Sequence, residues 1–103
     1  MFLPRGVIET EELGRRIDEL ALPDGVVKLR YTVGDDWSGD PAIFFWVTLS
    51  DEAARRPVLH RMSRRVQDLI AERIDPMREW GLIPYFSFRS ESEQAMLKDR
   101  DFG

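Results

Sequence analysis

Aromatic residues cluster in a short segment that could carry a contact surface. The run from Ala42 to Leu49 is apolar at nearly every position and includes Phe44, Phe45 and Trp46 in succession. Successive side chains of a strand point to opposite faces of a sheet, so this run supplies apolar groups to both faces. We predict that Phe44 and Trp46 lie opposite Phe45 and Val47. At least one of the first pair is then exposed in the monomer or buried by another chain.

The face expected to stay open combines aromatic rings with positive charges. Our candidates for partner binding, including one tryptophan in the preceding turn, are Lys28, Arg30, Trp37, Phe44, Trp46, Tyr85 and Arg89. Rings among basic side chains are typical of platforms that stack nucleobases, at roughly 1–3 kcal/mol per base. An exposed apolar sheet face also fits a protein partner or a homodimer. The net charge of −4 favours protein contact, and nucleic acid stays as the alternative.

A second candidate site is the basic segment from Arg55 to Arg65, which contains no acidic residue. Its candidates for anion binding are His60, Arg61, Arg64 and Arg65. Positive charges near the start of a helix oppose its dipole, so a bound anion would stabilise them. The alternative is a solvated or internally paired helix face, in which Arg64 pairs with Asp68 four residues on. Arg61 and Arg65 would then reach acidic residues of the first helix.

The third candidate is the acidic turn from Asp35 to Asp40. Asp35, Asp36 and Asp40 could bind a hard cation weakly, and a metal-dependent hydrolase at this turn is one functional alternative. The spacing is not that of an EF-hand, because the twelfth position from Asp36 is Val47 instead of Glu. Stabilisation of the turn is the other role for these aspartates. Trp37 packs against the core or contacts a partner.

The composition lacks the groups that several catalytic mechanisms require. The chain has no cysteine and one histidine, so a thiolate nucleophile, a disulfide and a cysteine zinc site are excluded. No serine lies in a nucleophile context. A pair of carboxylates for acid–base chemistry stays open, since 19 residues are Asp or Glu. We expect no catalytic activity, no metal site and no cofactor.

Length and composition indicate one domain. The 103 residues are 43% hydrophobic and 33% charged, which is too apolar for a disordered chain and too charged for a membrane protein. No apolar run approaches the roughly 20 residues of a membrane helix, and no signal core follows the first residues. We expect a cytoplasmic protein, consistent with the lack of cysteine. The strong preference for arginine over lysine is typical of a GC-rich bacterial genome.

Hydrophobic periodicity predicts the elements that position these candidates. They are a helix from Thr10 to the break at 23–25, strands at 26–33 and 42–49, a long helix from Ser50 or Pro57 to before Pro76, and a strand at 83–89. The two helices cover one sheet face. Facing them are Val27, Leu29, Tyr31, Val33, Ile43, Phe45, Val47 and Leu49, and the long helix contributes Leu59, Met62, Val66, Leu69, Ile70 and Ile74. Residues 1–9 form an N-terminal arm, 10–89 the domain, and 90–103 a tail or one helical turn.

This order predicts a two-layer α+β domain, with a three-stranded sheet and two helices on one face. Over about residues 10–89 the layout resembles the type II KH arrangement, as seen in ribosome-binding factor A and BolA-like proteins. A KH domain grips nucleic acid with a Gly-X-X-Gly loop between two helices, and the segment from Arg55 to Trp80 supplies no such loop. The resemblance therefore concerns layout alone.

We expect a small, soluble, non-catalytic protein-interaction domain, and a homodimer through the aromatic sheet face is one form of that interaction. One alternative is an RNA- or DNA-binding domain that uses the same face together with the Arg55–Arg65 cluster. The hydrolase at the acidic turn is another. A further alternative is that the Phe2-Leu3-Pro4 segment or the tail folds over the aromatic side chains.

Overall fold

The computed structural model of this chain describes the backbone of residues 5–102 and the side chains of residues 11–96. Its elements are α1 (Arg5–Asp18), β1 (Val26–Asp35), β2 (Pro41–Leu49), α2 (Arg56–Arg73), α3 (Pro76–Trp80), β3 (Ile83–Ser90) and α4 (Glu91–Phe102). The predicted α+β fold and its order are confirmed, with the short α3 inserted and α4 appended. In the described part of the chain, no helix has the length and apolar character needed to cross a membrane.

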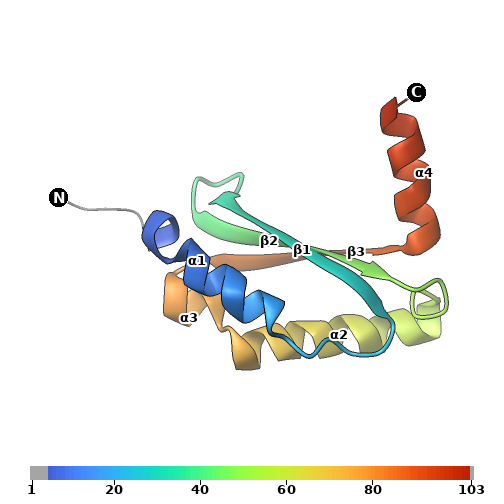
Figure 1. The fold of residues 1–103 in the computed structure, drawn as a ribbon, viewed down its shortest axis with the longest axis horizontal. Coiled ribbons are helices and arrows are strands. Elements are labelled where there is room, and N and C mark those ends of the chain that lie inside the picture. Colours follow the sequence, from blue (N-terminus) through green and yellow to red (C-terminus); the bar gives the residue numbers. More distant parts are fainter. Residues whose placement is uncertain (1–4, 103) are drawn as a thin grey trace.

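The three strands form one mixed sheet with β2 in the centre. Strand β1 pairs antiparallel with β2 as a hairpin, and β3 pairs parallel with β2 on its other side. A parallel neighbour requires a crossover, which α2 and α3 provide. Figure 1 shows α1 and α2 on one side of the sheet, while the β1–β2 turn and α4 rise at its two ends on the other side.

One hydrophobic core lies between the sheet and these helices. Its largest fully buried side chains are Leu13, Ile43, Phe45, Val47, Leu49, Val66, Ile70 and Ile74. Full burial of each such side chain stabilises the fold by about 1.5–3 kcal/mol. Every second residue of β2, from Ile43 to Leu49, therefore faces the helices, as predicted. Trp46 is 41% exposed and Phe44 is half-buried on the opposite face, so the predicted division of this strand is confirmed.

The prediction that Val27 faces the helices is wrong. The register of β1 shifts between Val26 and Lys28, and a bulge of this kind displaces the alternation of side chains by one position. Val26 packs against the core instead, whereas Val27 is 52% exposed on the side of Lys28. From Leu29 onward the strand alternates as the sequence indicates.

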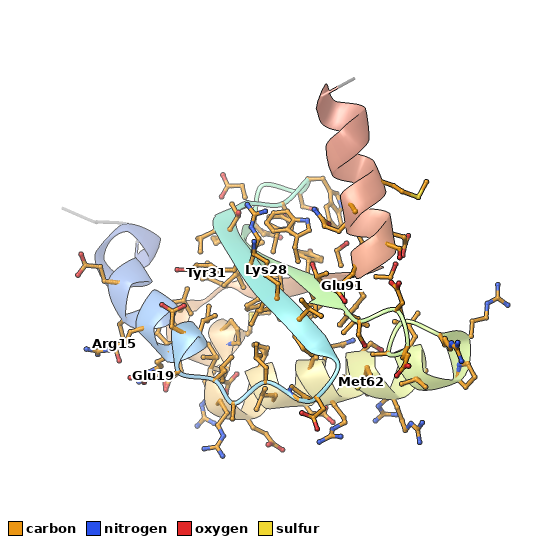
Figure 2. All side chains as sticks on the ribbon, turned by 45° about the vertical axis from the view of Figure 1, so that its right-hand side comes forward. Arg15, Glu19, Lys28, Tyr31, Met62 and Glu91 are labelled. Atoms are coloured by element: carbon orange, nitrogen blue, oxygen red, sulfur yellow. The ribbon has the colours of Figure 1, made fainter. Side chains whose placement is uncertain are left out.

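Helix α1 begins at Arg5, earlier than the predicted cap at Thr10. Residues 5–9, assigned from sequence to an arm, thus belong to the helix, while Met1–Pro4 lie outside the described residues. Gly14 allows α1 to approach β1, since a Cβ there would lie 2.7 Å from the Tyr31 hydroxyl oxygen. Figure 2 shows Tyr31 on the side of β1 that adjoins α1.

Helix α2 begins at Arg56 with Pro57 in its first turn, which confirms the later of the two predicted starts. Ser50 instead stabilises the preceding turn, where its Oγ accepts a hydrogen bond from the Ala53 N–H at 3.2 Å. The predicted apolar stripe packs on the sheet through Met62, Val66 and Ile70. Leu69 lies at the margin of this stripe and is only half-buried.

Helix α4 occupies the segment for which the sequence indicated a tail or a single turn. Ser90 and Glu93 form a capping box: Ser90 Oγ accepts from the Glu93 N–H at 3.1 Å, and Glu93 Oε1 accepts from the Ser90 N–H at 3.2 Å. Asp51, before α2, accepts from the Ser92 N–H at 3.1 Å and from its hydroxyl at 2.6 Å. These bonds fix the base of α4 against the end of β2.

We predict that Val66→Asp unfolds the domain. Val66 is 0% exposed, and an unpaired carboxylate in the core costs several kcal/mol, a large part of the stability of a small domain. Arg64→Ala, on the exposed side of the same helix, should cost under about 1 kcal/mol. Thermal melts of both variants measure the difference. Equal destabilisation would mean that α2 presents other residues to the sheet.

Candidate functional site

The open face of the sheet, the side away from α1 and α2, gathers most of the predicted partner-binding residues. Strand register places its side chains in rows that cross the sheet. From the α4 end these rows are Lys28–Thr48–Arg89, Arg30–Trp46–Ser87, Thr32–Phe44–Tyr85 and Gly34–Ala42–Ile83. The acidic turn, with Trp37, follows the last row. The predicted residues thus lie on one continuous surface.

Four rings form an aromatic row along this face, consisting of Trp37, Tyr85, Phe44 and Trp46. The ring centroids of Trp37 and Tyr85 are 5.0 Å apart, those of Tyr85 and Phe44 are 5.4 Å apart, and those of Phe44 and Trp46 are 6.3 Å apart. The last two pairs are stacked, with interplanar angles of 18° and 26°. Trp37 is 80% exposed, so its ring does not pack into the core. The row connects the acidic turn with the basic end of the face.

Asp36 fixes the turn-side end of the aromatic row. Its Oδ1 accepts hydrogen bonds from the Ser38 N–H at 2.8 Å and the Asp40 N–H at 3.0 Å. Its Oδ2 accepts a hydrogen bond from the Tyr85 hydroxyl at 2.8 Å. One carboxylate therefore closes the turn and also joins it to β3. Asp36 is buried, and its position determines where Tyr85 stands beneath Trp37.

The hydrogen bonds to Asp36 set its ionisation. Desolvation by burial alone would raise the pKa of Asp36, but the bonds from Tyr85, Asp40 and Ser38 outweigh it and hold the pKa below its ordinary 3.8. The pKa of the Tyr85 hydroxyl is raised above 10.0, first by its bond to Asp36 and then by desolvation and the charges of Asp36 and Asp40. At neutral pH the pair is a carboxylate and a neutral phenol, which makes a charge-assisted hydrogen bond.

The acidic turn has the geometry of a stabilised turn. The Asp36 carboxylate is fully engaged by the three donors, whereas Asp35 and Asp40 are exposed. Within the described residues, no group of three or more His, Cys, Asp or Glu side chains could hold a metal ion. Of the two roles considered for these aspartates, the hydrogen bonds support the structural one.

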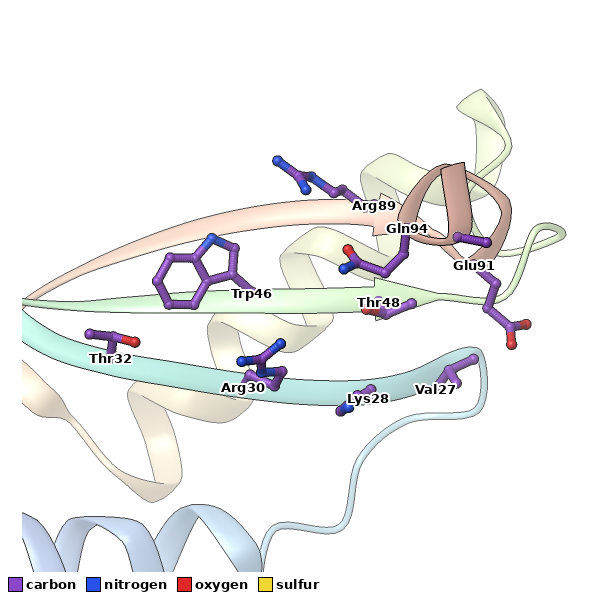
Figure 3. A pocket seen from close by; sticks show the side chains of 10 residues that line it. Val27, Lys28, Arg30, Thr32, Trp46, Thr48, Arg89, Glu91 and Gln94 are labelled. Atoms are coloured by element: carbon purple, nitrogen blue, oxygen red, sulfur yellow. The ribbon is translucent and has the colours of Figure 1, made fainter. Parts of the chain in front are cut away.

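The basic end of the open face contains a groove of about 500 Å³ between the sheet and α4. Figure 3 shows Trp46 of β2 standing between Arg30 of β1 and Arg89 of β3. Other lining residues are Val27, Lys28, Thr32, Thr48, Glu91, Gln94 and Ala95. The first two rows of the sheet form the floor and the first turns of α4 form a wall. An aromatic ring beside three cations can bind an acidic group next to an apolar one.

The basic cluster on α2 is separate from this groove. His60, Arg61, Arg64 and Arg65 are all exposed on α2, which lies on the covered side of the sheet. Among residues 11–96 the ion pairs are those of Arg15 and Arg16 with Glu12, so the pair of Arg64 with Asp68 that we considered does not form. The structure therefore places the two groups of basic candidates on opposite sides of the molecule.

Sequence reasoning missed the wall of the groove. Glu91, Gln94 and Ala95 were assigned to a tail, although Ser90 and Glu93 have the spacing of a capping box and could have indicated a helix. The bond between Asp36 and Tyr85 joins residues 49 positions apart, and no local pattern signals such a contact.

Comparisons with known proteins found no relative, so the site is interpreted from its own geometry. No known family model matches the chain, and neither a curated protein nor a solved structure matches it. The structure itself establishes the α+β element order, whereas no structural neighbour supports the resemblance to the type II KH arrangement.

We predict that Asp36→Asn makes the free energy of unfolding less dependent on pH between pH 7 and pH 3. Because the pKa of Asp36 is lower in the folded protein than in the unfolded chain, its contribution is full at neutral pH and is lost as the pH falls below about 4. The variant should be less stable than wild type at pH 7 and should lose less stability between pH 7 and pH 3. Urea unfolding across this range measures the slope.

Asp68→Asn is the matched control, because it removes an exposed carboxylate on α2. It should keep the wild-type slope. If Asp36→Asn retained the full wild-type acid sensitivity, the role assigned to the Asp36 carboxylate would be wrong.

Proposed function

We propose that this protein is a non-catalytic binding domain that contacts another protein through its open face. The observation that carries the proposal is the aromatic row, in which four rings touch in sequence on the uncovered side of the sheet. Soluble proteins seldom leave contiguous apolar surface uncovered unless it has a binding role. Trp, Tyr, Phe and Arg are also the residues enriched at protein interfaces.

Trp46 is the proposed anchor of the contact. It lies in the centre of its row, is flanked by Arg30 and Ser87, and forms the apolar part of the groove floor. Central aromatic residues surrounded by polar groups typically dominate binding energy. The bond from Tyr85 to Asp36 supports this role, because a row that is already ordered loses less conformational entropy on binding.

A short nucleic-acid segment is the second candidate ligand. Lys28, Arg30 and Arg89 lie around Trp46, and such an arrangement fits a stacked base with its phosphate. A strand that followed the whole aromatic row would, however, approach the exposed carboxylate of Asp40 beside Tyr85. The net charge of −4 also opposes a polyanion. These charges favour a protein partner.

Affinity capture with a matched pair of variants tests the proposed function. Since a chain without cysteine fits the cytoplasm, tagged protein is expressed in its natural host and recovered from the cytoplasmic extract, with and without nuclease. Protein partners, whether other chains or untagged copies of this one, should survive nuclease. Trp46→Ala should remove them, because the anchor is lost. Met77→Ala, which truncates a 53% exposed side chain on α3, should retain them.

Two results would contradict the proposal. Loss of every partner after nuclease treatment would favour the nucleic-acid alternative. Equal capture by wild type and Trp46→Ala would mean that the aromatic row does not carry the contact.

A further inference from the structure

Charge is distributed unequally along the open face. The positive side chains of Lys28, Arg30 and Arg89 lie in the two rows beside α4, and the exposed carboxylate of Asp40 lies near Tyr85 at the opposite end. The rows that begin with Lys28 and Gly34 are roughly 20 Å apart at the rise of a strand. This exceeds the screening length of about 8 Å at physiological salt, so the two ends act as separate poles.

The two poles also differ in shape. The turn projects from the negative end, and Trp37 within it is the most exposed large apolar side chain among the described residues. The positive end is hollowed, since the groove lies there between the sheet and α4. One end therefore presents a tryptophan beside the Asp40 carboxylate, and the other end presents a recess lined by Trp46 and three cations.

These ends match each other when two copies meet. A two-fold axis that lies between two facing sheets, perpendicular to their strands, brings the negative end of each copy opposite the positive end of the other. We propose that the open face binds a second copy of this chain, with the Trp37 turn of each protomer seated in the groove between the sheet and α4 of its partner. This inference rests on the proposed function, because it specifies the partner of the same surface.

Charge selects this orientation over the alternatives. A two-fold axis parallel to the strands would place Arg30 and Arg89 of one copy near the same residues of the other, and like charges in an interface are unfavourable. In the proposed arrangement, Asp40 approaches the cations of the partner, while Trp37 reaches the ring of Trp46. The central row with Phe44 lies on the axis and meets its own equivalent.

A second copy fits the whole face better than an anionic ligand does. A polyanion that followed the face would be attracted to Lys28 and Arg30 but repelled by Asp40 at the other end. Another copy of the chain supplies negative charge at the positive end and positive charge at the negative end. The complementarity is reciprocal, as a closed dimer requires.

A charge exchange between two variants tests the arrangement. Arg30→Glu alone places the new carboxylate near Asp40 of the partner in both halves of the dimer. Asp40→Lys alone places the new ammonium near Arg30 of the partner. Each variant should therefore raise the dimer dissociation constant by roughly tenfold or more. An equal mixture should restore wild-type affinity as a heterodimer. One half then pairs the new carboxylate with the new ammonium, and the other half keeps Arg30 with Asp40.

Sedimentation equilibrium over a series of protein concentrations measures these constants. Arg73→Glu and Asp68→Lys provide the control mixture, since both positions are exposed on α2, on the covered side of the sheet. Both should dimerise like wild type, alone and mixed. Thermal melts check that every variant is folded, and Arg89→Glu replaces Arg30→Glu if the latter is not.

The outcomes separate this inference from the proposed function. A wild-type protein that stays monomeric at high micromolar concentration overturns the second copy as partner, while capture through Trp46 can still support a different protein. A dimer that Trp46→Ala breaks but the charge variants leave unchanged overturns the end-to-end orientation and keeps the binding face. A dimer unaffected by Trp46→Ala and by the charge variants contradicts both proposals.

Discussion

The hydrogen bond between Asp36 and Tyr85 is the interaction on which the open face depends. It joins the β1–β2 turn to β3 across the sheet, and its carboxylate also accepts two backbone N–H groups within the turn. Without it, Trp37 would lose the ring on which it rests, and the aromatic row would end at Phe44. The cost of burying Asp36 is offset by its three donors, so a polar group organises an otherwise apolar surface.

The central strand β2 supplies both the core and the candidate contact. Phe45 and Val47 stabilise the packing of α1 and α2, whereas Phe44 and Trp46 belong to the aromatic row. A face built on a central strand is rigid, because its backbone is hydrogen-bonded on both sides. The proposed binding surface therefore derives its order from the same packing that stabilises the fold.

The sequence pattern was sufficient to predict which residues of β2 face the core and where α2 begins. The alternation in β2 placed Phe45 inside and Trp46 outside, and Pro57 marked the start of α2. Val27 was misplaced because two adjacent valines satisfy the pattern equally well until the bulge selects one of them. The groove could not be predicted, since its wall depends on Asp51 holding the base of α4 through Ser92.

An NMR dilution series that follows the indole N–H signals tests the central claim most directly, since the chain has three tryptophans in distinct surroundings. Trp37 and Trp46 belong to the open face, whereas Trp80 is buried beneath the guanidinium of Arg16. If the open face binds a second copy of the chain, the signals of Trp37 and Trp46 shift along one common binding curve as the protein is concentrated, and the Trp80 signal stays constant. Constant Trp37 and Trp46 signals in a protein that self-associates over the same range would contradict the account.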